Sequence, residues 1–147
     1  MDPSTVRVLV ADDFGPWRRF VRITLQTEQN ICIVGEATEG LEALQRANET
    51  KPDLILLDFG LSKLDGMEAA KRIREVLPRV KILVASQYDE PDIVSAALKN
   101  GVDGYLLKID APSELLPAIE AVLRGEKFLS RSLKDFKSFN GIPSVPG

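Results

Sequence analysis

Residues 54–58 read Leu-Ile-Leu-Leu-Asp, four apolar side chains followed directly by a carboxylate. A run this short and this continuously apolar is typical of a strand that is buried on both faces of a sheet. The packing of such a strand does not require a carboxylate at its end, because burying an unpaired charge costs free energy. The stretch therefore predicts a parallel strand and, directly after it, a functional aspartate, Asp58.

Similar apolar runs recur along the chain and alternate with segments of helical periodicity. The expected strands are Val6–Ala11, Ile31–Ala37, Leu54–Leu57, Val80–Ala85 and Asp103–Leu107. Such a repeated β-α alternation indicates an α/β protein with helices on both faces of a parallel sheet. The rules for crossover connections then favour a flavodoxin-like, doubly wound, five-stranded sheet with strand order 2-1-3-4-5.

Helix boundaries can be read from a few residues. Asp65 and Glu68 form a capping-box pattern at the start of the third helix, and Pro78 is expected to end that helix. Pro117 falls inside the fifth helix, where it lacks the N–H that would bond one turn back. Two interpretations are open: this helix starts late, near Ser113, or it is kinked at Pro117.

The pattern of strands and helices ends at Gly125. We therefore expect residues 1–5 to form an N-terminal tail and residues 6–125 to form one domain. Residues 126–147 are expected to be a C-terminal extension that packs partly on the last helix and is disordered towards its end. An extension of this length is too short for a second domain, so no output domain is expected.

Composition excludes several classes of function. The 147-residue chain has no histidine, which removes catalytic triads and every histidine-ligated metal site. The single cysteine, Cys32, cannot form an internal disulfide, and its apolar neighbours favour a core position. A net charge of −3 does not suggest a chain that coats nucleic acid. Without a signal peptide or an apolar span, the sequence predicts a cytoplasmic protein that does not enter a membrane.

Polar side chains stand at the ends of four expected strands: Asp12 and Asp13, Asp58, Ser86 and Lys108. In open parallel sheets, ligands bind at the carboxyl ends of the strands, so these side chains are expected to converge. Carboxylates that lie close together repel one another unless a cation joins them. Oxygen ligands without Cys or His select a hard ion, and Mg²⁺ is the expected one. The set suits phosphoryl transfer to a carboxylate.

Each of these residues also has a structural interpretation. Asp13 could instead cap the first helix, and for this residue alone the two interpretations are equally weighted. Ser86 alone could be a turn residue, and Lys108 an ordinary surface lysine. Tyr105 could be a core residue with its hydroxyl at the edge of the sheet. The coincidence of all the polar residues at strand ends favours the functional interpretation.

Four pieces of sequence follow one another in a characteristic order: Val8-Leu-Val-Ala-Asp12-Asp13, Leu56-Leu-Asp58-Phe-Gly-Leu-Ser-Lys-Leu-Asp65-Gly66, Val84-Ala-Ser86 and Gly104-Tyr105-Leu-Leu-Lys108. With these pieces, the chain resembles a bacterial response-regulator receiver domain from about residue 6 to residue 125. The last piece is most similar to the subfamily that usually carries a helix-turn-helix output domain. This resemblance implies a two-component signalling protein that acts as a phospho-accepting switch and not as an enzyme.

The resemblance also implies roles for individual residues. It implies that Asp58 is the phosphoacceptor and that Asp13 binds Mg²⁺ directly, with help from Asp12. Asp58 itself and the backbone carbonyl of Gly60 would complete the protein ligands of the ion.

The same resemblance implies that Ser86 and Lys108 bind the phosphoryl group. Tyr105 would be an aromatic switch that turns inward when Ser86 is drawn to the phosphoryl group. Gln87 departs from the family pattern, because a small residue is usual at this position, and it could crowd the phosphoryl pocket.

The implied partner is a sensor histidine kinase or a phosphotransfer protein. Homodimerisation is plausible through the face of the fourth helix, fifth strand and fifth helix, or through the terminal helix. Two other functions are open. An Asp-nucleophile phosphatase of the haloacid-dehalogenase type would need a second acidic residue two positions after the first, and residues 12–15 do not provide it. DNA binding would have to use the basic stretch of residues 124–137, which is better explained as a solvated tail, so no nucleic acid is expected to bind this chain alone.

Overall fold

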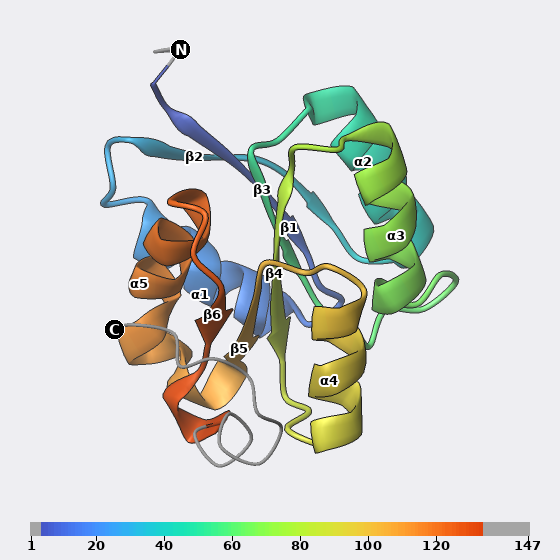
Figure 1. Cartoon of the computed structure of the whole chain (residues 1–147). Helices are drawn as coiled ribbons and strands as arrows, with labels where there is room; N and C mark the ends of the chain where they lie inside the picture. Colours follow the sequence, from blue (N-terminus) through green and yellow to red (C-terminus); the bar gives the residue numbers. More distant parts are fainter. Residues whose placement is uncertain (1–3, 134–147) are drawn as a thin grey trace. The chain divides into compact units, whose positions relative to one another are not determined.

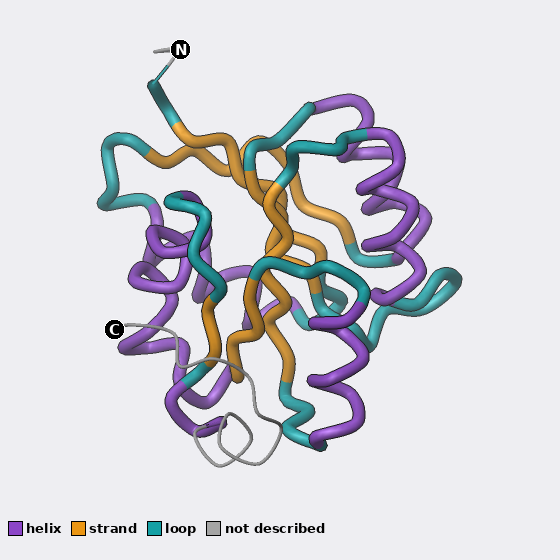
Figure 2. Tube along the Cα trace, in the orientation of Figure 1, coloured by secondary structure: helices purple, strands orange, loops and turns teal. Residues whose placement is uncertain are grey.

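The protein is described by a computed structural model that covers residues 4–133. Strands and helices alternate along this part of the chain (Figures 1 and 2). The strands are β1 (Val6–Ala11), β2 (Ile31–Ala37), β3 (Leu54–Leu57), β4 (Lys81–Ser86), β5 (Gly104–Leu107) and β6 (Phe128–Leu129). The α-helices are α1 (Gly15–Leu25), α2 (Gly40–Thr50), α3 (Gly66–Val76), α4 (Pro91–Lys99) and α5 (Ala111–Leu123). Two 3₁₀ helices complete the described elements, η1 (Lys108–Asp110) and η2 (Arg131–Leu133).

The strand order is β2-β1-β3-β4-β5-β6. This order confirms the predicted doubly wound sheet, to which β6 adds a short strand that the sequence pattern did not reveal. The bounds of β1, β2 and β3 agree with the prediction, whereas β4 and β5 each begin one residue later than expected. The chain divides into two compact units, with the boundary between Ile82 and Leu83 inside β4.

In the first unit, β1 pairs in parallel with β2 on one side and with β3 on the other. Helix α1 packs on β2, and α2 packs on β1, β2 and α3; Figure 1 shows α2 and α3 side by side. The predicted burial of β2 on both faces is wrong, because only Ala37 at its end is fully buried. This strand has a neighbour on one side only, so its residues, including Cys32, remain half-exposed.

In the second unit, β5 pairs in parallel with β4 and with β6. Helix α4 packs on β5, and α5 packs on both β5 and β6. Most apolar side chains of β5 and α5 are almost fully buried, including Leu106, Leu115 and Ile119. Burial of this face against the strands is what holds α5 in place, despite the proline within it.

Several predicted helix boundaries can now be compared with the structure. Asp65 caps α3 by accepting a 2.9 Å hydrogen bond from the backbone N–H of Glu68, and the helix ends at Val76, before Pro78. The capping prediction is therefore confirmed. Of the two interpretations left open for α5, the late start near Ser113 is wrong, because this helix begins at Ala111 and continues through Pro117.

The segment after Gly125 has structure of its own as far as the described residues extend. It forms β6, which pairs with β5 and packs on α5, and η2, which is bonded to Glu114 and Asp110. The predicted disorder at the end of the chain concerns residues 134–147, which lie outside the described residues.

Candidate functional site

Asp12 and Asp13 lie in the short turn between β1 and α1. Asp12 is buried, with 1% of its surface exposed, and its Oδ1 atom accepts a 2.8 Å hydrogen bond from the backbone N–H of Phe14. Its carbonyl accepts a hydrogen bond from Arg18 Nη1 at 2.9 Å. Asp13 is exposed. The N-cap position of α1 belongs to Phe14 and has no side-chain cap, so the alternative interpretation of Asp13 as a helix cap is wrong.

Asp58 follows the last residue of β3 and lies beside the end of β1. The two strands are parallel neighbours with Ala11 opposite Leu57, so the residues that follow them emerge at the same edge. The backbone N–H of Asp58 donates to the carbonyl of Ala11 at 3.0 Å, which fixes the start of the loop. Asp58 keeps 8% of its surface exposed, so solvent and small ligands can still reach it.

The structure brings the three predicted carboxylates together. Asp12, Asp13 and Asp58 each offer one oxygen atom, and these three atoms lie within 4.8 Å of one another. Their donor chemistry fits a hard divalent cation, because such ions prefer carboxylate oxygen, and three negative charges at this spacing repel one another without one. The residues therefore fit Mg²⁺. Gly60 lies in the turn two residues after Asp58 and is exposed.

The loop after Asp58 is held by close packing at the start of α3. A side-chain carbon placed on Gly66 would lie 2.5 Å from the backbone oxygen of Asp58 and 2.6 Å from the Cα atom of Phe59. Both of these atoms belong to the backbone, so they cannot move aside as the end of a flexible side chain could. Gly66 therefore allows α3 to begin directly against the residue that follows β3, which fixes the backbone of Asp58.

Ser86 and Tyr105 lie in the second unit and are linked through the backbone of Tyr88. Ser86 ends β4 and is fully buried, and its hydroxyl accepts a 3.0 Å hydrogen bond from the N–H of Tyr88. Tyr105 is also fully buried in β5, and its hydroxyl donates a 2.7 Å hydrogen bond to the carbonyl of Tyr88. The ring of Tyr105 is therefore in an inward position, and Gln87 is exposed.

Lys108 directly follows β5, at the same level as Ser86. The parallel register places Leu107 opposite Ser86, so the ammonium-bearing residue follows at the carboxyl end of this pair of strands. Lys108 is partly exposed and begins η1, and the next residue, Ile109, has 82% of its surface exposed. The predicted phosphoryl-binding residues of the second unit thus emerge at the same edge of their own strands.

Sequence reasoning missed a buried carboxylate in the second unit, Asp110. Burial alone would raise its pKa, but hydrogen bonds from the hydroxyl and backbone N–H of Ser132, together with the nearby Ser130 hydroxyl and the charge of Arg131, outweigh that effect, so the pKa is lowered from 3.8. Two of its contacts come from Ser132, whose Oγ and N lie 2.8 and 3.2 Å from the carboxylate oxygens. In the sequence, Asp110 is simply an acidic residue between the last expected strand and the last helix. Acidic residues are common at helix starts, so nothing marked this one as buried.

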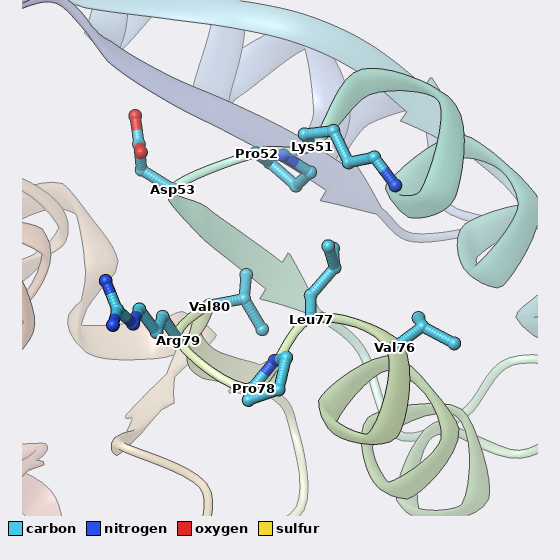
Figure 3. Close-up of a pocket in the computed structure, with 8 residues that line it drawn as sticks. All are labelled: Lys51, Pro52, Asp53, Val76, Leu77, Pro78, Arg79 and Val80. Carbon is cyan, nitrogen blue, oxygen red and sulfur yellow. The ribbon is translucent and has the colours of Figure 1, made fainter.

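A cavity of ≈ 370 Å³ lies elsewhere in the first unit (Figure 3). It is lined by Lys51, Pro52, Asp53, Val76, Leu77, Pro78, Arg79 and Val80. Asp53 immediately precedes β3, whereas Asp58 follows it, so the cavity lies at the opposite end of that strand from the three carboxylates. None of the predicted site residues lines this cavity.

Within residues 4–133, no helix combines the length and the apolar character that crossing a membrane requires.

Comparison with known proteins agrees with this geometry. Residues 8–120 match the family model of the response regulator receiver domain. The response regulator protein VraR of Staphylococcus aureus is 38% identical over 122 residues, which are 83% of this chain and 58% of VraR. The chain thus spans somewhat more than half the length of this relative.

Solved structures show the same fold. A LuxR-family two-component response regulator from Aurantimonas sp. SI85-9A1 superposes with a TM-score of 0.87 at 29% identity, covering 95% of this chain and 99% of that one. An RcsB response regulator from Salmonella typhimurium gives 0.84 at 26% identity, covering 94% and 69% of the two chains. Another RcsB structure contains two dimers bound to two parallel DNAs. The matched family model, the receiver fold and the relatives of the LuxR type together establish that this chain belongs to the response regulator receiver domain family of two-component signalling.

Proposed function

We propose that the chain is a Mg²⁺-dependent switch that accepts a phosphoryl group on Asp58 from a histidine kinase or a phosphotransfer protein. The single observation that carries the proposal is the convergence of Asp12, Asp13 and Asp58 within 4.8 Å. No structural need of the fold accounts for three carboxylates at one edge of a sheet, whereas a site for phosphoryl transfer requires them.

Asp12, Asp13, Asp58 and the backbone carbonyl of Gly60 are the proposed protein ligands of Mg²⁺. When bound, the ion would offset the charge of the carboxylates and of the incoming phosphoryl oxygens. The 8% exposure of Asp58 suits a nucleophile, because the donor must approach one of its oxygens along the line of the bond that breaks.

In the proposed reaction, a carboxylate oxygen of Asp58 forms a bond to phosphorus while the bond from phosphorus to the donor's imidazole nitrogen breaks. The leaving imidazole keeps the electron pair and takes up a proton from solvent. Lys108 would then neutralise one phosphoryl oxygen, and the Ser86 hydroxyl would donate to another. Ser86 can do so and still accept the N–H of Tyr88, because a hydroxyl is both a donor and an acceptor.

The inward Tyr105 supports a switching role. A phosphoryl group that binds Ser86 would favour the arrangement in which Tyr88 bonds both Ser86 and Tyr105, by shifting an existing equilibrium. The altered face would be that of α4, β5 and α5, which is also the proposed surface for homodimerisation. A histidine-kinase donor would place the chain in the cytoplasm.

Intact-mass measurement after incubation with Mg²⁺ and acetyl phosphate tests the assignment. Wild-type chain should gain one phosphoryl group, and Asp58→Asn should gain none. Asp53→Asn is a matched control, because it removes a carboxylate from the opposite end of β3 and should be labelled like the wild type. Equal labelling of Asp58→Asn and wild type would contradict the proposal. Steady turnover of a generic phosphate ester would favour a phosphatase instead.

A further inference from the structure

Residues 126–133, which we call the C-terminal strap, pair with β5 through the two-residue strand β6. Phe128 lies opposite Gly104 and Leu129 opposite Tyr105 in parallel register. At the end of this pairing, the N–H of Ser130 donates to the carbonyl of Tyr105 at 3.0 Å. The strap is thus joined to the backbone of the proposed switch residue itself.

Ser130 makes a second bond to the end of β5 through its side chain. Its hydroxyl accepts a 2.8 Å hydrogen bond from the N–H of Leu107, the residue immediately before Lys108. The same hydroxyl donates to Glu114 Oε1 at 3.0 Å, and Ser130 is fully buried. Ser130 therefore bonds to the backbone of β5 on both sides of Leu106. One bond is to the carbonyl of Tyr105, and the other is from the N–H of Leu107, which directly precedes Lys108.

Two carboxylates at the start of α5 hold the rest of the strap. Glu114 accepts the N–H of Arg131 at 3.3 Å with each of its oxygens, and Asp110 accepts the N–H and hydroxyl of Ser132. Arg131 Nε also lies 3.9 Å from Asp110. Hydrogen bonds to a carboxylate are stronger than those between neutral groups, so the strap is anchored by more than its two-residue strand.

We propose that the C-terminal strap is the output element of the switch, with Ser130 as the positioning residue that couples it to the end of β5. The inference rests on the proposed function, in which the phosphoryl group is bound by Lys108. When Lys108 is drawn to that group, the N–H of Leu107 and the carbonyl of Tyr105 are fixed in the positions that bind Ser130. Phosphorylation then favours the docked strap.

Because such coupling is reciprocal, a looser strap must also weaken binding of a phosphoryl mimic by the same factor. This distinguishes the inference from a merely structural role for the strap. A structural anchor would affect exchange of the strap with solvent equally in the phosphorylated and unphosphorylated chain, and would leave the affinity for the mimic unchanged.

Hydrogen–deuterium exchange of the whole chain, read on peptides that cover residues 126–133, tests the inference. Addition of Mg²⁺ and acetyl phosphate should slow exchange of the strap about fivefold, a coupling at the lower end of the usual range. Asp58→Asn should show no slowing. In Glu114→Ala, the strap should exchange faster without acetyl phosphate, and the addition of Mg²⁺ and acetyl phosphate should slow this exchange much less than in the wild type. The same substitution should weaken binding of beryllofluoride with Mg²⁺ about fivefold.

Ser113→Ala is the matched control. Ser113 lies next to Glu114, and its hydroxyl donates to the carbonyl of Asp110 within its own turn. It should behave like the wild type in both measurements. Ser130→Ala should repeat the effect of Glu114→Ala, which keeps the test valid should one of the two variants fold poorly.

The two proposals fail in different ways. Wild-type chain that carries a phosphoryl group by mass, but shows no change of exchange in the strap, would overturn the strap inference and leave the proposed function standing. If Glu114→Ala bound beryllofluoride as tightly as the wild type, the strap inference would likewise be overturned and the proposed function would stand. Absence of phosphoryl uptake by the wild type would overturn both.

Discussion

The hydroxyl of Tyr105 donates a 2.7 Å hydrogen bond to the carbonyl of Tyr88, although the two residues stand 17 positions apart in the sequence. Tyr88 in turn donates its N–H to the hydroxyl of Ser86. Tyr88, in the loop after β4, is therefore bonded both to the last residue of β4 and to the neighbouring strand β5. This relationship makes the contribution of the Tyr105 hydroxyl measurable.

Tyr105→Phe should lower the free energy of unfolding by about 1 kcal/mol, the usual net value of one hydrogen bond. The ring stays, so no cavity forms and the packing of β5 is kept. Urea denaturation followed by circular dichroism measures the change. Tyr88→Phe is the control, because the side chain of Tyr88 is exposed, and its effect should stay within about 0.5 kcal/mol. Equal effects of the two substitutions would argue against a contribution from the bond.

Gly66→Ala should destabilise the protein by about 1–3 kcal/mol, because the added carbon would overlap backbone atoms of Asp58 and Phe59. It should also weaken Mg²⁺ binding, since the loop that carries Asp58 must shift. Thermal unfolding with and without Mg²⁺ measures both effects. Gly15→Ala is the control for stability, because its added carbon would meet only the flexible end of Arg18, at 3.7 Å. If both substitutions proved neutral, the close approach of α3 to Asp58 would be wrong.

Mg²⁺ should stabilise the wild-type chain, because a ligand that binds only the folded state raises the free energy of unfolding. The gain is about 2.7 kcal/mol when the ion is at 100 times its dissociation constant. Asp13→Asn should reduce this gain strongly, since it removes a charged ligand. It should raise stability slightly in the absence of the ion, by relieving repulsion among the three carboxylates.

Calorimetric unfolding at several Mg²⁺ concentrations measures this prediction. Asp53→Asn should retain the full gain, since Asp53 lies at the other end of β3. An equal gain in wild type and Asp13→Asn would show that the ion binds elsewhere.

Asp110 should make stability depend on pH in acid. Its pKa is lowered from 3.8 in the folded state, so the folded protein holds the ionised form more strongly than the unfolded chain does. The stabilisation is therefore fully present above about pH 4 and is lost as the pH falls through the lowered pKa. Asp110→Asn should remove this part of the acid dependence and destabilise the chain at neutral pH.

Denaturant unfolding of wild type and Asp110→Asn between pH 7 and pH 3 measures the effect, with Asp53→Asn as the control. The free-energy difference between wild type and Asp110→Asn should shrink as the pH falls. A difference that stayed constant over this range would contradict the role of the ionised Asp110.

Much of the fold could be predicted from the sequence, since continuous apolar runs such as residues 54–57 can bury both faces only inside a sheet. The same argument failed for β2, because the predicted strand order places this strand at the edge of the sheet, where an apolar run need not be fully buried. The late start near Ser113, one of the two interpretations left open for α5, gave too much weight to the low helix propensity of Pro117. Burial of residues such as Leu115 and Ile119 on β5 stabilises the helix in spite of it.

The candidate site was predicted well where topology alone determines position. Asp12, Asp13 and Asp58 converge because parallel strands bring their carboxyl ends to one edge, and this can be read from sequence order. The contacts of Asp110 and Ser130 could not be predicted. They depend on the chain turning back after α5 to pair with β5, and a two-residue strand carries no periodic signal.

The pairing of β6 with β5 has a consequence for how the protein behaves at high concentration. A strand without a neighbour exposes a row of N–H and carbonyl groups, onto which another molecule can add a strand and begin to aggregate. Along β5, that row is covered by a segment of its own chain only two residues long, which is too short to recruit a foreign strand in its turn. Truncation before Phe128 should therefore make the remaining protein prone to self-association through β5.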